Sequence, residues 1–196
     1  NMSLSRAGKN LFHDPKGDDG LSALGWSYID RILQSANDIC LVLNPSVNAY
    51  RRLDPHFEAP NQIKASGINR GAMVRIPLGN ERSTRVEVRS VAPDTNPYMA
   101  FYTLLRTGLE GPESQESVEQ KRTRTRFLPD NIYDAVRQFK ASSLVETRLG
   151  GEVQSKFAEL KQASADRCPK DLGSLIKRAE VQFHHEVTNQ YLWGIF

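Results

Sequence analysis

The feature that most restricts the fold is a pair of alternating segments near the middle of the chain. In residues 72–78, Val74, Ile76 and Leu78 share one face, and in residues 85–89 (RVEVR) two valines alternate with three charged residues. Successive side chains of a strand point to opposite faces, so both segments are predicted to be strands. Gly79 and polar residues separate them, as in a hairpin connection, so an antiparallel pair is expected.

A helix is predicted before these strands. From Asp19, a candidate N-cap, apolar residues recur at helical spacing towards Cys40, and Asn44-Pro45 is expected to end the helix. The apolar residues that share its buried face are Leu21, Leu24, Tyr28, Ile32 and Ala36.

A second helix is predicted after the strands. Asn96 can cap its N-terminus and Pro97 suits its first turn. Gly108 and Gly111-Pro112 are expected to end it. The residues expected to form its apolar stripe are Tyr98, Phe101, Leu104 and Leu105.

The remainder of the chain is predicted to be a polar loop followed by helices. Residues 113–126 are charged and show no apolar periodicity, which is typical of a surface loop. Three amphipathic helices are expected beyond it, the first capped by Asp130 and the last beginning near Asp171. The chain ends in YLWGIF (191–196), an apolar segment expected to dock on a core or on another subunit.

Length and composition exclude several classes of protein. With 196 residues, 39% hydrophobic and 25% charged, the chain can bury a core without disulfides, and Cys40 and Cys168 form no C-x-x-C pair. A reducing, cytoplasmic location is therefore expected. The formal charge of +3 gives no reason to expect a nucleic-acid partner. The longest apolar run, residues 39–43, is far shorter than the roughly 20 residues that cross a membrane.

Arginine is concentrated between residues 51 and 89, where the only lysine is Lys64. The planar guanidinium fork suits carboxylates and phosphates. In the RVEVR segment, Glu87 lies between two arginines, either on a solvated face of ion pairs or as an ionised metal ligand. Glu58, in a predicted loop, is either solvated or a general base. The sequence has neither G-x-x-x-x-G-K-[ST] nor G-x-G-x-x-G, so neither phosphate-binding loop is indicated.

Several short motifs, in order along the chain, resemble the catalytic domain of the glutamine synthetase family, type I. They are NMSLS (1–5), GKNLF (8–12), NP (44–45), NAYRRL (48–53), EAP (58–60), NR (69–70), RIP (75–77), RVEVR (85–89) and NPY (96–98). The resemblance implies an α+β fold, with antiparallel strands of the partial-barrel catalytic domain, a helical C-terminal region and no small N-terminal β domain. It divides the chain into residues 1–111, the C-terminal part of the ATP- and glutamate-binding domain, a polar loop at 112–130, and a helical region with an apolar docking tail at 131–196.

The same resemblance implies roles for individual residues. Arg52 and Arg89 correspond to arginines that bind glutamate, and Glu58 to the flap glutamate that takes a proton from ammonium. Glu87 corresponds to a ligand of Mg²⁺ or Mn²⁺. The residues expected to bind the nucleotide are Ser3, Arg70, Arg75 and Arg82. Of these, Arg70 is expected to contact the transferred phosphoryl group, where cations stabilise the developing negative charge.

The reaction implied is the ATP-dependent ligation of ammonia to glutamate through γ-glutamyl phosphate, in a dodecamer with active sites between subunits. The family often has SARNRS where this chain has SGINRG (66–71), so Ile68 replaces an arginine. A γ-glutamyl amine (polyamine) ligase is therefore an alternative. The family's metal-ligating histidine, a Gly-rich loop and most metal-binding glutamates precede the position of Asn1, so the chain alone is expected to be inactive. A non-catalytic assembly or interaction module is the second alternative.

Overall fold

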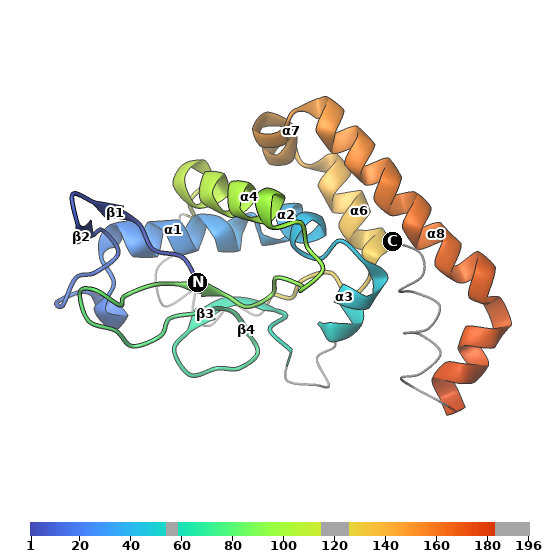
Figure 1. The fold of residues 1–196 in the computed structure, drawn as a ribbon, viewed down its shortest axis with the longest axis horizontal. Coiled ribbons are helices and arrows are strands. Elements are labelled where there is room, and N and C mark those ends of the chain that lie inside the picture. Colours follow the sequence, from blue (N-terminus) through green and yellow to red (C-terminus); the bar gives the residue numbers. More distant parts are fainter. Residues whose placement is uncertain (54–58, 115–125, 183–196) are drawn as a thin grey trace.

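The computed structural model describes residues 1–53, 59–114 and 126–182. In the last helix it describes the backbone as far as residue 182 and the side chains as far as residue 166. Helices lie against a small mixed sheet, so the fold is α+β as expected (Figure 1). The strands are β1 (Ser5–Arg6), β2 (Lys9–Asn10), β3 (Gln62–Ser66), β4 (Ala72–Arg75) and β5 (Glu87–Val88). The helices are α1 (Ala23–Gln34), α2 (Ala36–Leu43), α3 (Val47–Arg52), α4 (Pro97–Glu110), α6 (Ile132–Ala141), α7 (Ser143–Leu149) and α8 (Gly151–Gln182), and a 3-10 turn, η1, spans Asp18–Gly20.

The first predicted helix is two helices, and its cap is not Asp19. Asp19 lies in η1 with a left-handed backbone (φ 53°), and Ser22 caps α1 by accepting a hydrogen bond from the Gly25 N–H at 3.1 Å. Ser35, with φ −94° and ψ 7°, ends α1 and begins α2. Helix α2 ends at Leu43, just before Asn44-Pro45 as predicted.

The sheet has the order β3–β4–β5. Strands β4 and β5 are antiparallel, with Val74 opposite Val88 and Arg75 opposite Glu87, which confirms the predicted pairing. Strand β3 was not predicted, and it pairs with β4 in parallel. Because the two strands run in the same direction, residues 67–71 must return alongside them. The sheet is therefore mixed, because β3 adds a parallel pair to the expected antiparallel one, and the described strands form no closed barrel.

Helix α4 begins as predicted but buries a different face. The Asn96 carboxamide accepts from the backbone N–H groups of Tyr98 and Met99, and Pro97 occupies the first turn. Of the predicted stripe only Leu104 is buried, whereas Tyr98, Phe101 and Leu105 are exposed. The reason is that small residues on the other side let α4 pack closely on α1 (Figure 1). The residues buried on that side are Ala100, Thr103, Leu104, Thr107 and Gly108.

The C-terminal helices pack through α6, which contacts both α2 and α8. Asn131, not Asp130, caps α6, because its side chain accepts from the Asp134 N–H at 2.9 Å. Helix α8 continues through Asp171, so the separate last helix was a wrong prediction. The apolar segment 191–196 lies outside the described residues. Among the helices that the structure describes, none combines the length and apolarity needed to span a membrane.

The core lies between the helices and the sheet and also between the helices themselves. Phe12 and Tyr28 pack with ring centroids 5.1 Å apart, and Phe139 and Phe157 with centroids 5.6 Å apart. Cys40 is buried in this core, where burial raises the pKa of its thiol to about 12. The thiol is therefore protonated at neutral pH and acts as a packing residue.

Candidate anion-binding site

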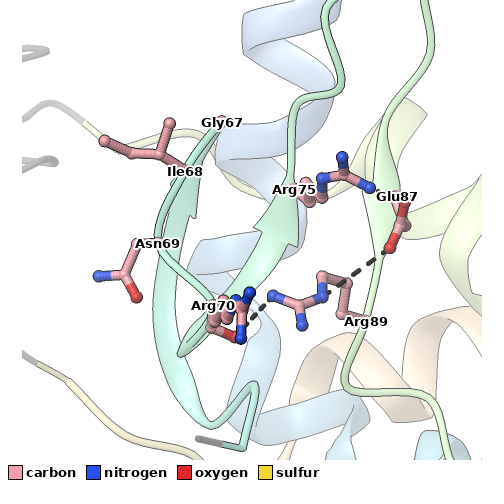
Figure 2. A pocket seen from close by; sticks show the side chains of 7 residues that line it. All are labelled: Gly67, Ile68, Asn69, Arg70, Arg75, Glu87 and Arg89. Carbon is pink, nitrogen blue, oxygen red and sulfur yellow. Dashed lines mark hydrogen bonds and ion pairs between the residues drawn. The ribbon is translucent and has the colours of Figure 1, made fainter.

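A pocket of about 560 Å³ opens beside the sheet where β4 and β5 lie side by side (Figure 2). Arg75 ends β4 and Glu87 begins β5, directly opposite each other in the register. Arg89 follows β5, and Arg70 lies on the returning 67–71 loop. The described residues that line the pocket are Gly67, Ile68, Asn69, Arg70, Arg75, Glu87 and Arg89.

Glu87 lies between two arginines, but only one of them, Arg89, is indicated by the RVEVR alternation; the other is Arg75 in place of Arg85. Its Oε2 is 3.3 Å from Arg75 Nη1 on the neighbouring strand, and its Oε1 is 3.8 Å from Arg89 Nε. Arg85 instead donates to the Asn1 side-chain oxygen at 3.2 Å and to the Ser83 carbonyl at 3.0 Å. Among the described residues that line the pocket there are three guanidinium groups and one carboxylate, a balance of charge that favours an anion.

The 67–71 loop is held by side chains on both sides of the pocket. Ser66 Oγ accepts from the Asn69 N–H at 3.0 Å, and Asn69 Oδ1 accepts from the Gly71 N–H at 2.8 Å. Arg89 Nη1 donates to the Arg70 carbonyl at 2.6 Å. Ile68 is 95% exposed, and Figure 2 shows its side chain pointing away from Arg75 and Glu87.

Arg52, at the end of α3, is half-buried and is not among the described residues that line the pocket. Its Nη2 donates to the carbonyls of Arg89 and Val91, each at 2.8 Å. Burial lowers the pKa of Arg52, the Asp94 carboxylate raises it, and the nearby Arg89 guanidinium lowers it again. The Arg52 guanidinium is thus close to Arg89, but it donates to main-chain carbonyl groups.

The other predicted site residues lie apart from this pocket or outside the described residues. Ser3 is exposed and follows Met2, which pairs with Val86. Arg82 is exposed in a turn in which its N–H donates to Asn80 Oδ1 at 3.0 Å. Glu58 lies outside the described residues. The roles of these residues stay predictions.

The described residues do not by themselves fit a divalent metal ion. Within residues 1–53, 59–114 and 126–166, whose side chains the structure describes, no group of three or more histidine, cysteine or acidic side chains is placed to hold one. Mg²⁺ prefers about six oxygen ligands, and Glu87 offers one carboxylate that two guanidiniums already contact. The role of Glu87 as a ligand of Mg²⁺ or Mn²⁺ stays a prediction.

Sequence reasoning missed two elements of the site. The first is β3, whose short segment QIKAS (62–66) does alternate, with Ile63 and Ala65 between polar residues, so a signal for this strand was present in the sequence. The second is the contact of Arg89 with the Arg70 backbone, which depends on the path of the returning loop. The pairing of Arg75 with Glu87 follows from the register of two strands that were predicted, and counting residues from the turn could have suggested it.

The chain is thus an α+β domain with an arginine-lined pocket at a strand pair, an arrangement suited to binding carboxylates or phosphates. The family described as "Glutamine synthetase, catalytic domain" matches residues 1–179, and the chain belongs to this family. Relatives named glutamine synthetase from Staphylococcus epidermidis and Staphylococcus aureus are each 34% identical over 180 residues, which cover 85% of this chain and 40% of the relative. The chain thus spans about 40% of the length of these relatives.

Proposed function

We propose that this chain is the C-terminal part of the catalytic domain of an ATP-dependent glutamate–ammonia ligase. The observation that carries this proposal is the convergence of Arg70, Arg75 and Arg89 on one pocket in a member of the glutamine synthetase family. In our proposal, Arg70 and Arg75 contact phosphate groups of ATP, and Arg89 contacts the substrate glutamate.

The chemistry has two steps, and both place negative charge near such arginines. A glutamate γ-carboxylate oxygen attacks the terminal phosphorus of ATP, and the bond to ADP breaks. Ammonia then attacks the acyl carbon of γ-glutamyl phosphate, loses a proton to a base and expels phosphate. Fixed cations stabilise the charge that develops on the phosphoryl oxygens in the first step and on the leaving phosphate in the second. Glu58 stays the predicted base.

The proposal is tested in a chimera. This chain replaces the matching region of the S. aureus relative, and glutamine formation is measured with ATP, glutamate and ammonia, in parallel with a panel of primary amines. We expect ammonia-dependent turnover by the chimera and none by this chain alone. A chimera that folds and assembles like its parent but turns over neither nucleophile would contradict the proposal. Turnover with amines alone would favour a γ-glutamyl amine ligase.

A second measurement tests the pocket in this chain alone. Glu87, whose side chain is 26% exposed, partly neutralises Arg75 and Arg89. Glu87→Gln removes that negative charge and is expected to tighten the binding of inorganic phosphate about threefold to tenfold at low ionic strength. Isothermal titration calorimetry measures the change, and it should shrink as salt is added.

The matched control for that variant is Glu81→Gln, which removes the same charge from an exposed residue that does not line the pocket. It should leave phosphate binding within about a factor of two. Equal effects of the two substitutions would show that net charge, and not the pocket, governs the affinity.

A further inference from the structure

The loop that carries Arg70 is short for the two strands that it joins. Strands β3 and β4 run in parallel, with Ser66 opposite Arg75 in the register, and only residues 67–71 connect them. A connection between parallel strands ordinarily needs about a dozen residues or more. The short return keeps the loop alongside the strands, where it forms one wall of the pocket (Figure 2). The path of this wall therefore depends on how each end of the loop is held.

Ser66, the last residue of β3, holds the first end of the loop. Its Oγ accepts hydrogen bonds from the backbone N–H groups of Asn69 at 3.0 Å and Ile68 at 3.3 Å. Its carbonyl accepts from the Ile76 N–H at 3.2 Å, in the segment that follows β4. Ser66 is thus tied to the sheet through its backbone and to the loop through its hydroxyl. Serine hydroxyls stabilise turns in this way because they accept from N–H groups a few residues further on.

The second end of the loop is closed around Arg70. Asn69 Oδ1 accepts from the Gly71 N–H at 2.8 Å, so Arg70 lies between the acceptor and the donor of one hydrogen bond. The Arg70 carbonyl also accepts from Arg89 Nη1 at 2.6 Å. The backbone of Arg70 therefore has little freedom once Asn69 is fixed. Because the Ser66 hydroxyl holds the Asn69 N–H, it also fixes the point from which the Arg70 side chain extends.

The Ser66 side chain acts on the pocket indirectly. Ser66 is not among the described residues that line the pocket, whereas Arg70 is one of them. Binding of a phosphate by two guanidinium nitrogens requires a set orientation, and a small displacement of the loop removes one of the two bonds. We propose that Ser66 is a positioning residue of the anion pocket, whose hydroxyl fixes the 67–71 loop and so holds the Arg70 guanidinium where it can bind a phosphoryl group. This inference rests on the proposed function of the pocket.

Alanine and threonine at position 66 test this role. Ser66→Ala removes the acceptor, whereas Ser66→Thr keeps the hydroxyl and suits the end of a strand. Ser155→Ala is the matched control, because Ser155 is exposed on α8 and its hydroxyl donates to Glu159 at 3.1 Å. In isothermal titration calorimetry with inorganic phosphate, we expect Ser66→Ala to weaken binding about threefold to tenfold. Ser66→Thr should stay within about a factor of two of the unaltered chain, and Ser155→Ala should change nothing.

A cycle of double substitutions shows whether the effect passes through Arg70. If Ser66 positions Arg70, Ser66→Ala should have almost no further effect on phosphate binding once Arg70→Gln has removed the guanidinium. In an Arg75→Gln background it should keep its full effect. A general loss of stability would weaken binding equally in both backgrounds. Equal effects in the two backgrounds, or binding by Ser66→Thr as weak as binding by Ser66→Ala, would therefore overturn the proposal.

The mobility of the Arg70 side chain separates this inference from the proposed function. If the unaltered chain binds no phosphate, the pocket proposal fails, but Ser66→Ala must still lower the heteronuclear NOE of Arg70 Nε relative to Ser66→Thr, because the loop has lost a fixed end. An unchanged NOE would overturn the positioning role on its own. If Ser66→Ala does not fold, Ser66→Cys, whose thiol accepts hydrogen bonds only weakly, takes its place in every comparison.

Discussion

Replacing Gly108 with alanine is expected to lower the free energy of unfolding by about 3 kcal/mol. A Cβ at this position would lie 2.2 Å from Cε2 of the Tyr28 ring, far inside contact distance. Tyr28 is fully buried, and its hydroxyl donates to the Leu104 carbonyl at 3.0 Å on the same helix as Gly108. The ring therefore cannot move aside without losing that bond, and α1 and α4 must separate. Urea denaturation followed by circular dichroism measures the change.

Gly151→Ala is the control for the loss of a glycine in a helix. A Cβ there would meet only Glu146 side-chain atoms at 3.7 Å or more, so we expect stability within about 0.5 kcal/mol of the unaltered chain. A double variant with Tyr28→Leu should recover part of the loss caused by Gly108→Ala, because the smaller side chain makes room. Equal stabilities of Gly108→Ala and the unaltered chain would show that α1 and α4 do not pack at this point.

Local sequence signals predicted those parts of the fold that local interactions decide. The Asn96 cap, the Pro97 turn and the two alternating segments each depend on a few neighbouring residues, and each is found. The buried face of α4 depends instead on what packs against it. Helical spacing favours Tyr98, Phe101 and Leu105 as core, yet the close approach of Tyr28 requires the side with Gly108. The sequence of α4 alone does not contain that information.

In the candidate site, too, the sequence predicts which residues are present but not how they contact one another. The family motifs identify Arg70, Arg75, Glu87 and Arg89, and the fold brings all four to one pocket. Their contacts depend on strand register and on the path of the 67–71 loop, so the pairing of Glu87 with Arg75 could not be derived from alternation along a single strand. Arg52 belongs to the same motifs, yet its direction towards two carbonyls depends on the position of α3.

The second large effect is expected for Arg70 in the chimera with the S. aureus relative. Arg70→Gln should lower kcat about 10²–10³-fold with a smaller change in the KM for glutamate, because in our proposal this cation stabilises charge that develops only during phosphoryl transfer. Steady-state rates of phosphate release at saturating ATP and ammonia give both constants. Arg137→Gln, on the exposed side of α6, should leave both unchanged.

The geometry makes Arg70 a favourable position for this test. Arg89 contacts the carbonyl of Arg70, not its side chain, and Ser66 and Asn69 bond to backbone groups of the same loop. Replacing the Arg70 side chain therefore removes a guanidinium from the pocket while the loop keeps these bonds. Arg70→Lys keeps the charge but not the planar fork, and it should recover only part of the lost rate. An Arg70→Gln chimera with an unchanged kcat would mean that the phosphoryl group is stabilised elsewhere, and the assignment of this pocket to phosphoryl transfer would then be wrong.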